Sequence, residues 1–150
     1  MPIAVVNPTT GATEEEFPAH TPAEVQERLA KAQAAYEVLR RSSYDQRAAW
    51  MTKAADLMEA DVDALATMIV REMGKPITQA RGEALKCVKN MRFYAKNAKT
   101  FLADEPLADP SSVNAQAAWS RYEPLGVILA VMPWNFPLWQ VMRFAAPALM

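Results

Sequence analysis

Residues Glu123 to Arg143 have the sequence EPLGVILAVMPWNFPLWQVMR, and this stretch decides the fold that we expect. Leu125 to Met132 is an unbroken apolar run, which is typical of a β-strand covered on both faces in a parallel sheet. Pro133 has no N–H to donate and must end such a strand, whereas Pro137 suits the first turn of a helix. The stretch therefore predicts a buried strand, an irregular turn and a helix, as in α/β proteins.

Asn135 lies inside this turn, two residues before Pro137. Its side-chain oxygen is expected to accept hydrogen bonds from the first amides of the helix, as N-cap residues do. Its NH2 group would then point out of the carboxyl end of the strand, where open α/β sheets bind ligands. The spacing leaves two interpretations open, an ordinary helix cap and a side chain that acts on a ligand.

The upstream sequence predicts helices with clear starting signals. A capping box, Thr21-Pro22-Ala23-Glu24, begins a helix that runs to about residue 40, and Ser43 with Gln46 repeats the signal. This second helical region ends at Gly74, with a break expected near Asp61. The other expected elements are an edge strand and a hairpin within residues 1–20, a helix over 77–101, a linker over 104–114 and an alternating strand over 115–123.

Several motifs in the chain resemble the aldehyde dehydrogenase superfamily. They are PLG at 124–126, the pentapeptide PWNFP at 133–137 and APAL at 146–149. The segments PLWQVMR (137–143) and REMGKPITQAR (71–81) are most similar to the bacterial succinate-semialdehyde dehydrogenase branch. The resemblance extends over nearly the whole chain but only over the N-terminal portion of a family member.

The resemblance implies an α/β fold in which N-terminal helices precede the first strand of a Rossmann-like cofactor-binding sheet. Residues 1–150 would form the N-terminal part of the NAD(P)-binding domain, without the catalytic domain. Residues 112–123 would join an arm through which family members form homodimers or homotetramers; an ordinary edge strand is the alternative. Because no second continuous apolar strand is present, we expect the fold to be incomplete and the chain to belong to a longer polypeptide.

The family oxidises an aldehyde to a carboxylic acid with NAD+ or NADP+, and the branch implies succinate semialdehyde as the substrate. A cysteine thiolate attacks the carbonyl and a glutamate activates water. Both residues are expected outside this chain, which would be inactive alone. Asn135 would serve as the catalytic donor to the oxyanion. By resemblance, Met132, Pro133, Trp134 and Asn135 contact the cofactor; core packing is the alternative for Trp134.

Arg143 is the candidate for binding the substrate carboxylate. It follows Asn135 by eight residues, about 12 Å along a helix axis, and helical side chains lean back toward the N-terminus. The remaining gap suits a four-carbon chain with an aldehyde at one end and a carboxylate at the other. Phe136 and Trp139 are predicted to contact the substrate as well. A structural ion pair with a carboxylate elsewhere is the alternative for Arg143.

Cys87 is the single cysteine, and it lies on the apolar stripe of the helix expected over 77–101. We interpret it as a buried, inert thiol rather than the family's nucleophile. His20 is the single histidine and has no neighbouring ligands in the sequence. The sequence therefore predicts no metal site.

Composition restricts the classes of partner. The chain has 150 residues with 16 Lys plus Arg and 17 Asp plus Glu, so no basic field attracts nucleic acid or anionic lipid. One cysteine suits a reducing, cytoplasmic compartment, and the prolines after residue 124 argue against a membrane span. A small carboxylate-bearing aldehyde is the expected ligand. The second hypothesis is a complete, non-catalytic helical module for binding or assembly.

Overall fold

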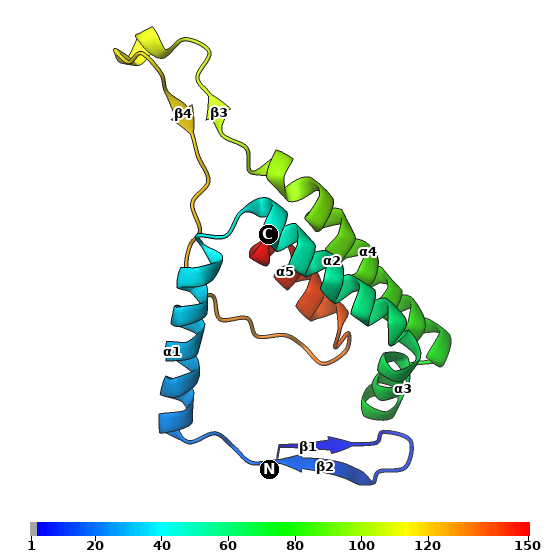
Figure 1. Ribbon diagram of the computed structural model, residues 1–150. Coiled ribbons are helices and arrows are strands. Elements are labelled where there is room, and N and C mark those ends of the chain that lie inside the picture. The colour runs from blue at the N-terminus through cyan, green and yellow to red at the C-terminus, as the bar shows by residue number, and fades with distance from the viewer. Residues whose placement is uncertain (1–2) are drawn as a thin grey trace.

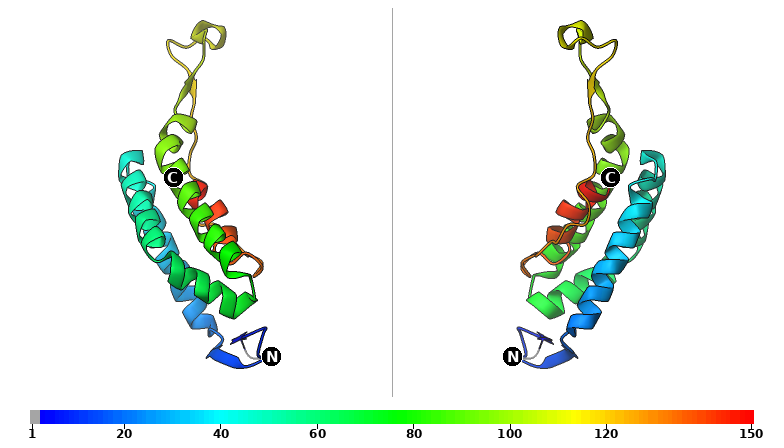
Figure 2. Two further views of the ribbon diagram at one scale, coloured as in Figure 1. Left: turned by 90° about the vertical axis from the view of Figure 1, so that its right-hand side faces the viewer. Right: turned by 90° about the vertical axis from the view of Figure 1, so that its left-hand side faces the viewer.

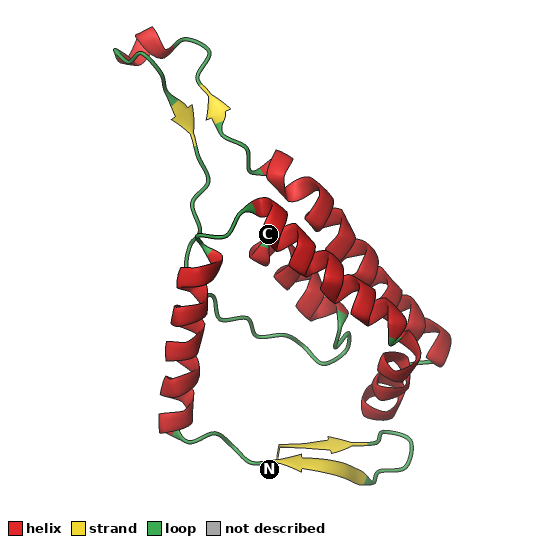
Figure 3. Cartoon of the chain, in the orientation of Figure 1, coloured by secondary structure: helices red, strands yellow, loops and turns green. Residues whose placement is uncertain are grey.

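The computed structural model describes residues 3–150, which form mostly helices with two small two-stranded sheets (Figure 3). The helices are α1 (Pro22–Leu39), α2 (Tyr44–Ala60), α3 (Val62–Met73), α4 (Ile77–Phe101) and α5 (Trp139–Leu149). α4 packs against α2, α3 and α5 to form a bundle, while α1 lies apart and buries none of its residues (Figure 1). No helix within the described residues is long and apolar enough to cross a membrane.

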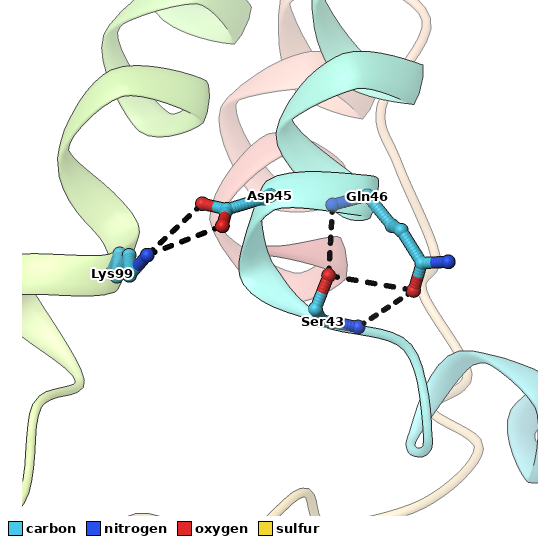
Figure 4. Close-up of polar contacts among 4 residues, drawn as sticks. All are labelled: Ser43, Asp45, Gln46 and Lys99. Atoms are coloured by element: carbon cyan, nitrogen blue, oxygen red, sulfur yellow. Dashed lines mark hydrogen bonds and ion pairs between the residues drawn. The ribbon is translucent and has the colours of Figure 1, made fainter.

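The capping signals predicted for the starts of α1 and α2 are confirmed. Thr21 and Glu24 form the capping box of α1. At the start of α2, the backbone amide of Gln46 donates to Ser43 Oγ at 3.1 Å. The backbone amide of Ser43 donates to Oε1 of the Gln46 side chain at 2.9 Å (Figure 4). The expected break also occurs, because Asp61 lies between the last residue of α2 and the first residue of α3 and is the cap residue of both.

The two sheets lie at opposite ends of the molecule (Figure 1). β1 (Ile3–Val6) and β2 (Thr13–Phe17) form the expected antiparallel hairpin. β3 (Glu105–Pro106) and β4 (Trp119–Ser120) form a short antiparallel ladder in an arm that extends from the bundle (Figure 2). The strand expected over 115–123 is therefore paired only at two residues, because β3 offers no longer partner, and the linker expected over 104–114 contains β3 and the 3-10 helix η1 (Pro110–Val113).

The core of the bundle consists largely of small side chains, which lets the helices approach closely. The largest fully buried side chains are only Ile69, Val88 and Cys87. Fully buried alanines come from α2, α3, α4 and α5. The position of α5 against α4 is thus fixed by close helix packing, and this packing places the turn before α5.

The sequence predicted a buried strand from Leu125 to Met132. For the described chain this prediction was wrong. The segment is irregular, and three of its side chains are almost wholly exposed, Leu125 at 93%, Leu129 at 87% and Val131 at 85%. A strand needs neighbours for its backbone groups, and none of the strands in residues 3–150 pairs with this segment. The described chain is therefore mainly helical with small sheets rather than a Rossmann-like sheet.

Replacing Gly74 with alanine is expected to destabilise the protein by about 1 to 2 kcal/mol. Gly74 caps α3 with a φ of +74°, and an added Cβ would lie 3.0 Å from Pro8 Cγ. Urea unfolding of the full-length protein measures the change. The matched control is Gly82→Ala in α4, where nothing lies within 4 Å of the added Cβ. That change should stabilise by about 0.4 to 1 kcal/mol, and equal effects of both would contradict the backbone explanation.

Candidate functional site

The predicted site residues lie in the turn before α5 and in the first part of α5 itself. Asn135 is exposed and makes no hydrogen bond with the rest of residues 3–150. α5 begins at Trp139 with Leu138 at the N-cap, so the expected cap by Asn135 was wrong. The helix starts two residues after Pro137, and the Gln140 amide donates to the Phe136 carbonyl at 2.9 Å across this proline. Leu138 has no side-chain acceptor, and another residue must therefore satisfy the first amides of α5.

Glu83 of α4 provides the missing acceptor. Its Oε1 accepts from the Leu138 amide and from the Trp139 amide, each at 3.0 Å. A carboxylate at this position also interacts favourably with the helix dipole. The Asn135 amide is consequently not used as a cap, and it is available to a ligand.

Lys75, in the loop between α3 and α4, binds the second oxygen of the Glu83 carboxylate. Its Nζ forms an ion pair with Glu83 Oε2, and the two residues are only 5% and 4% exposed. The same Nζ lies 3.6 Å from the centroid of the Phe136 ring. The Lys75–Glu83 pair therefore contacts the turn at two places, Phe136 and the start of α5.

Sequence analysis missed Glu83 because its partners lie more than fifty residues away in the chain. A signal was present, however. Glu83 lies on the same helix stripe as Ala80, Ala84 and Cys87, all of which are fully buried. An acidic residue on the apolar face of a helix requires a buried partner.

The aromatic residues of the turn differ in their surroundings. Trp134 is 75% exposed, so core packing is not its role in the described chain. Trp139 is partly buried, and Lys86 Nζ lies 3.8 Å from its ring centroid. Phe136 and Trp139 thus have cation–π contacts with lysines, and their contact with a substrate stays a prediction.

Arg143 lies one turn into α5 and is exposed. No carboxylate of residues 3–150 lies within ion-pair distance of its guanidinium. The alternative of a structural ion pair therefore has no partner within the described chain. A free guanidinium on a largely apolar helix is suited to binding an anion from outside this segment.

An apolar groove of about 900 Å³ lies between α1, residues 124–128 and α5. The Tyr36 hydroxyl donates to the Pro124 carbonyl at 3.3 Å across one of its edges. Its apolar lining includes Val38, Leu39, Trp50, Ile128, Phe144 and Leu149. Neither Asn135 nor Arg143 lines this groove, so it is separate from the predicted site residues.

Residues 132–135, which the sequence analysis expects to contact a cofactor, carry no charge, and three of the four are exposed. Met132 is half-buried, while Pro133, Trp134 and Asn135 are exposed and offer an apolar surface, a flat ring and one amide. These groups suit an uncharged aromatic ring. No charged residue occurs from Pro124 to Met142, so the phosphates of a dinucleotide require groups outside this segment.

Within residues 3–150, no group of three His, Cys, Asp or Glu side chains could hold a metal ion. His20 is exposed and lies just before α1, away from the turn.

Cys87 is buried, as predicted. Burial, together with the nearby negative charge of Glu83, raises the pKa of the Cys87 thiol to about 12. In the folded protein the thiol is therefore protonated at pH 8, whereas an unfolded thiol is partly ionised.

Cys87 is expected to react with iodoacetamide at pH 8 at least about 10²-fold more slowly in the folded protein than after unfolding in urea. The thiolate is the reactive form, and burial disfavours it. Mass spectrometry of the peptide that contains Cys87 measures the rate. Fast alkylation of the folded protein would contradict the assignment of an inert thiol.

Comparison with known proteins identifies the family. The model of the aldehyde dehydrogenase family matches residues 1–150. The chain belongs to the aldehyde dehydrogenase family. This aldehyde dehydrogenase chain is 56% identical over 150 residues to a protein of Mycobacterium tuberculosis (strain ATCC 25618 / H37Rv) named succinate-semialdehyde dehydrogenase [NADP(+)] 1. It is 51% identical over 150 residues to an aldehyde dehydrogenase of Paenarthrobacter nicotinovorans. The alignments cover 100% of this chain and 33% of each relative.

The fold is also similar to that of solved aldehyde dehydrogenases. The crystal structure of succinic semialdehyde dehydrogenase from Streptococcus pyogenes in complex with NADP+ superposes with a TM-score of 0.89 and 32% identity. The superposition covers 97% of this chain and 31% of that structure. The aldehyde dehydrogenase chain thus spans about a third of the length of the relatives that it matches.

Proposed function

We propose that this chain supplies the oxyanion donor and the substrate-carboxylate site of an enzyme that oxidises succinate semialdehyde to succinate. Asn135 and Arg143 are both exposed and both without a partner in residues 3–150, and this observation carries the proposal. The names of relatives that are 56% identical support the choice of substrate and of NADP+. In the overall reaction, a hydride leaves the aldehyde carbon, water supplies the second carboxylate oxygen, and two protons are released.

Asn135 would act on the aldehyde oxygen. Negative charge develops there when a nucleophile adds to the carbonyl carbon, and the amide NH2 donates a hydrogen bond to it. The amide remains neutral at pH 7 and does not itself supply a proton. A donor that is fixed before the reaction costs little reorganisation.

Arg143 would bind the carboxylate at the other end of the substrate. A guanidinium presents two parallel N–H groups to a carboxylate, which gives orientation as well as affinity. An uncharged aldehyde lacks this contact. We expect Phe136 and Trp139 to contact the apolar carbons between the two ends of the substrate.

Met132, Pro133, Trp134 and Asn135 would contact the nicotinamide end of NADP+, which accepts the hydride when bound. We further propose that residues 125–132 form the first strand of a Rossmann-like sheet in the full-length protein. The exposed apolar side chains of this segment support the proposal, because covering them removes apolar surface from water. The arm that contains residues 112–123 would then contribute to a homodimer or homotetramer.

The absorbance of reduced cofactor, followed with the full-length protein and a panel of aldehydes, tests this function. We expect NADPH to form fastest with succinate semialdehyde, and NADP+ to be preferred over NAD+. Uncharged aldehydes of the same length should react with a lower kcat/KM. Absence of NADPH formation with every aldehyde would reject the proposed function.

A further inference from the structure

We infer that Glu83 is a positioning residue for this reaction: its buried carboxylate holds the start of α5 and thereby the turn that presents Asn135. The inference rests on the proposed function of Asn135. Glu83 belongs to α4 and does not contact the reacting atoms. It would act only through the backbone that it binds.

The geometry of the Glu83 carboxylate supports this role. Oε1 accepts from the Leu138 and Trp139 amides at 3.0 Å each, and Oε2 pairs with Lys75 Nζ. Both oxygens therefore have partners, and two of the three partners are backbone amides of the turn and of α5. No side chain of the turn itself supplies this cap, because the N-cap position is Leu138.

The connection from Glu83 to Asn135 is short and stiff. Asn135 lies three residues before Leu138, and Pro133 and Pro137 restrict the backbone between them. Lys75 Nζ contacts the ring of Phe136, the next residue after Asn135. A shift of the cap would therefore move Asn135, and a displacement of about 1 Å can cost about 10²-fold in rate.

The opposing interpretation is that Lys75 and Glu83 form an ion pair that stabilises only the packing of the bundle. Two double variants separate the interpretations. Both remove the buried charges, and they differ in whether the side chain at position 83 can accept a hydrogen bond. Glu83→Gln/Lys75→Met keeps an amide oxygen that can accept from the Leu138 and Trp139 amides. Glu83→Leu/Lys75→Met removes the acceptor at nearly the same volume. Glu72→Gln, at an exposed acid of α3, is the matched control.

In the full-length protein, we expect Glu83→Leu/Lys75→Met to lower kcat for succinate semialdehyde at least about 10-fold with KM changed less than about threefold. Glu83→Gln/Lys75→Met should restore kcat to within about threefold of the wild type, as Glu72→Gln should. Equal loss of kcat in both double variants, or no loss in either, would overturn the positioning role.

Hydrogen–deuterium exchange gives a second readout that needs no activity. In Glu83→Leu/Lys75→Met, the Leu138 and Trp139 amides should exchange faster than in the wild type, while the amides of α2 should be unchanged. Unchanged exchange at Leu138 and Trp139 would overturn the inference. If the leucine variant does not fold, Glu83→Asp replaces it, since the shorter side chain withdraws the carboxylate from these amides; the same loss of kcat and faster exchange are expected, and their absence overturns the inference.

The two proposals fail in different ways. If the wild type forms no NADPH with any aldehyde, the proposed function is rejected, and exchange at Leu138 and Trp139 still decides whether Glu83 holds the turn. If the wild type is active and the variants behave alike, only the role of Glu83 is rejected.

Discussion

Replacing Asn135 with alanine is expected to lower kcat for succinate semialdehyde by about 10²- to 10³-fold in the full-length enzyme. The alanine variant loses the amide that would donate to the oxyanion, and this contact strengthens only as charge develops. Substrate affinity depends less on it, so KM should change little. Steady-state formation of NADPH at saturating substrate measures the loss.

Two further variants test the specificity of this effect. Asn97→Ala removes a side-chain amide of α4 whose one hydrogen bond within residues 3–150 goes to the Phe93 carbonyl at 2.7 Å, and its kcat should stay within about twofold of the wild type. Asn135→Asp keeps the shape but places a negative charge near the oxyanion, so its kcat should fall at least as far as that of Asn135→Ala. A rise in KM with unchanged kcat in Asn135→Ala would contradict a role in the transition state.

The helices of the bundle could be predicted because their signals are local. The capping boxes at Thr21 and Ser43 each satisfy helix amides with residues three positions away. Gly74 supplies the left-handed conformation that ends α3. None of these signals depends on how the chain folds in three dimensions.

Local signals could not decide whether residues 125–132 form a strand. An apolar run shows that a segment needs cover, but it does not show which part of a protein provides that cover. In the described chain, no strand pairs with the segment, and its side chains remain exposed. The prediction depended on partners that the local sequence does not contain.

The candidate site likewise contains one residue that the local sequence indicated and one that only the structure revealed. The motif PWNFP pointed to Asn135, whose amide the structure leaves exposed and without a partner in residues 3–150. The expectation that Asn135 also caps the helix was wrong, because Glu83 of α4 takes that position. Local spacing selected Asn135, whose catalytic role is our proposal, whereas Glu83, which binds the start of α5, comes from a distant part of the sequence.

The cap of α5 affects how freely the Asn135 side chain can bind a ligand. An asparagine that caps its own helix has its oxygen fixed by those amides, and rotation of the side chain is restricted by the helix. With Glu83 as the cap, the turn is held through its backbone, and the Asn135 side chain remains free to bind. In our proposal, therefore, Glu83 supports the turn and Asn135 acts on the substrate, so that the two tasks belong to different residues.

Replacing Arg143 with alanine is expected to lower kcat/KM for succinate semialdehyde by about 10- to 100-fold, mainly through a higher KM. The variant loses charge-assisted hydrogen bonds to the substrate carboxylate that are present both before and during the reaction. Butanal has the same number of carbons and no carboxylate, so its kcat/KM should change less than about threefold. NADPH formation with both aldehydes at a series of concentrations gives the comparison.

The matched control is Arg28→Ala, since Arg28 is an exposed arginine of α1 without an ion pair in residues 3–150. It removes the same charge from a different helix and should leave both aldehydes unaffected. Arg143→Lys keeps the charge but loses the planar fork, so it should recover only part of the affinity for the semialdehyde. Equal losses for succinate semialdehyde and butanal in Arg143→Ala would show that Arg143 supports the fold of the site and does not bind the carboxylate.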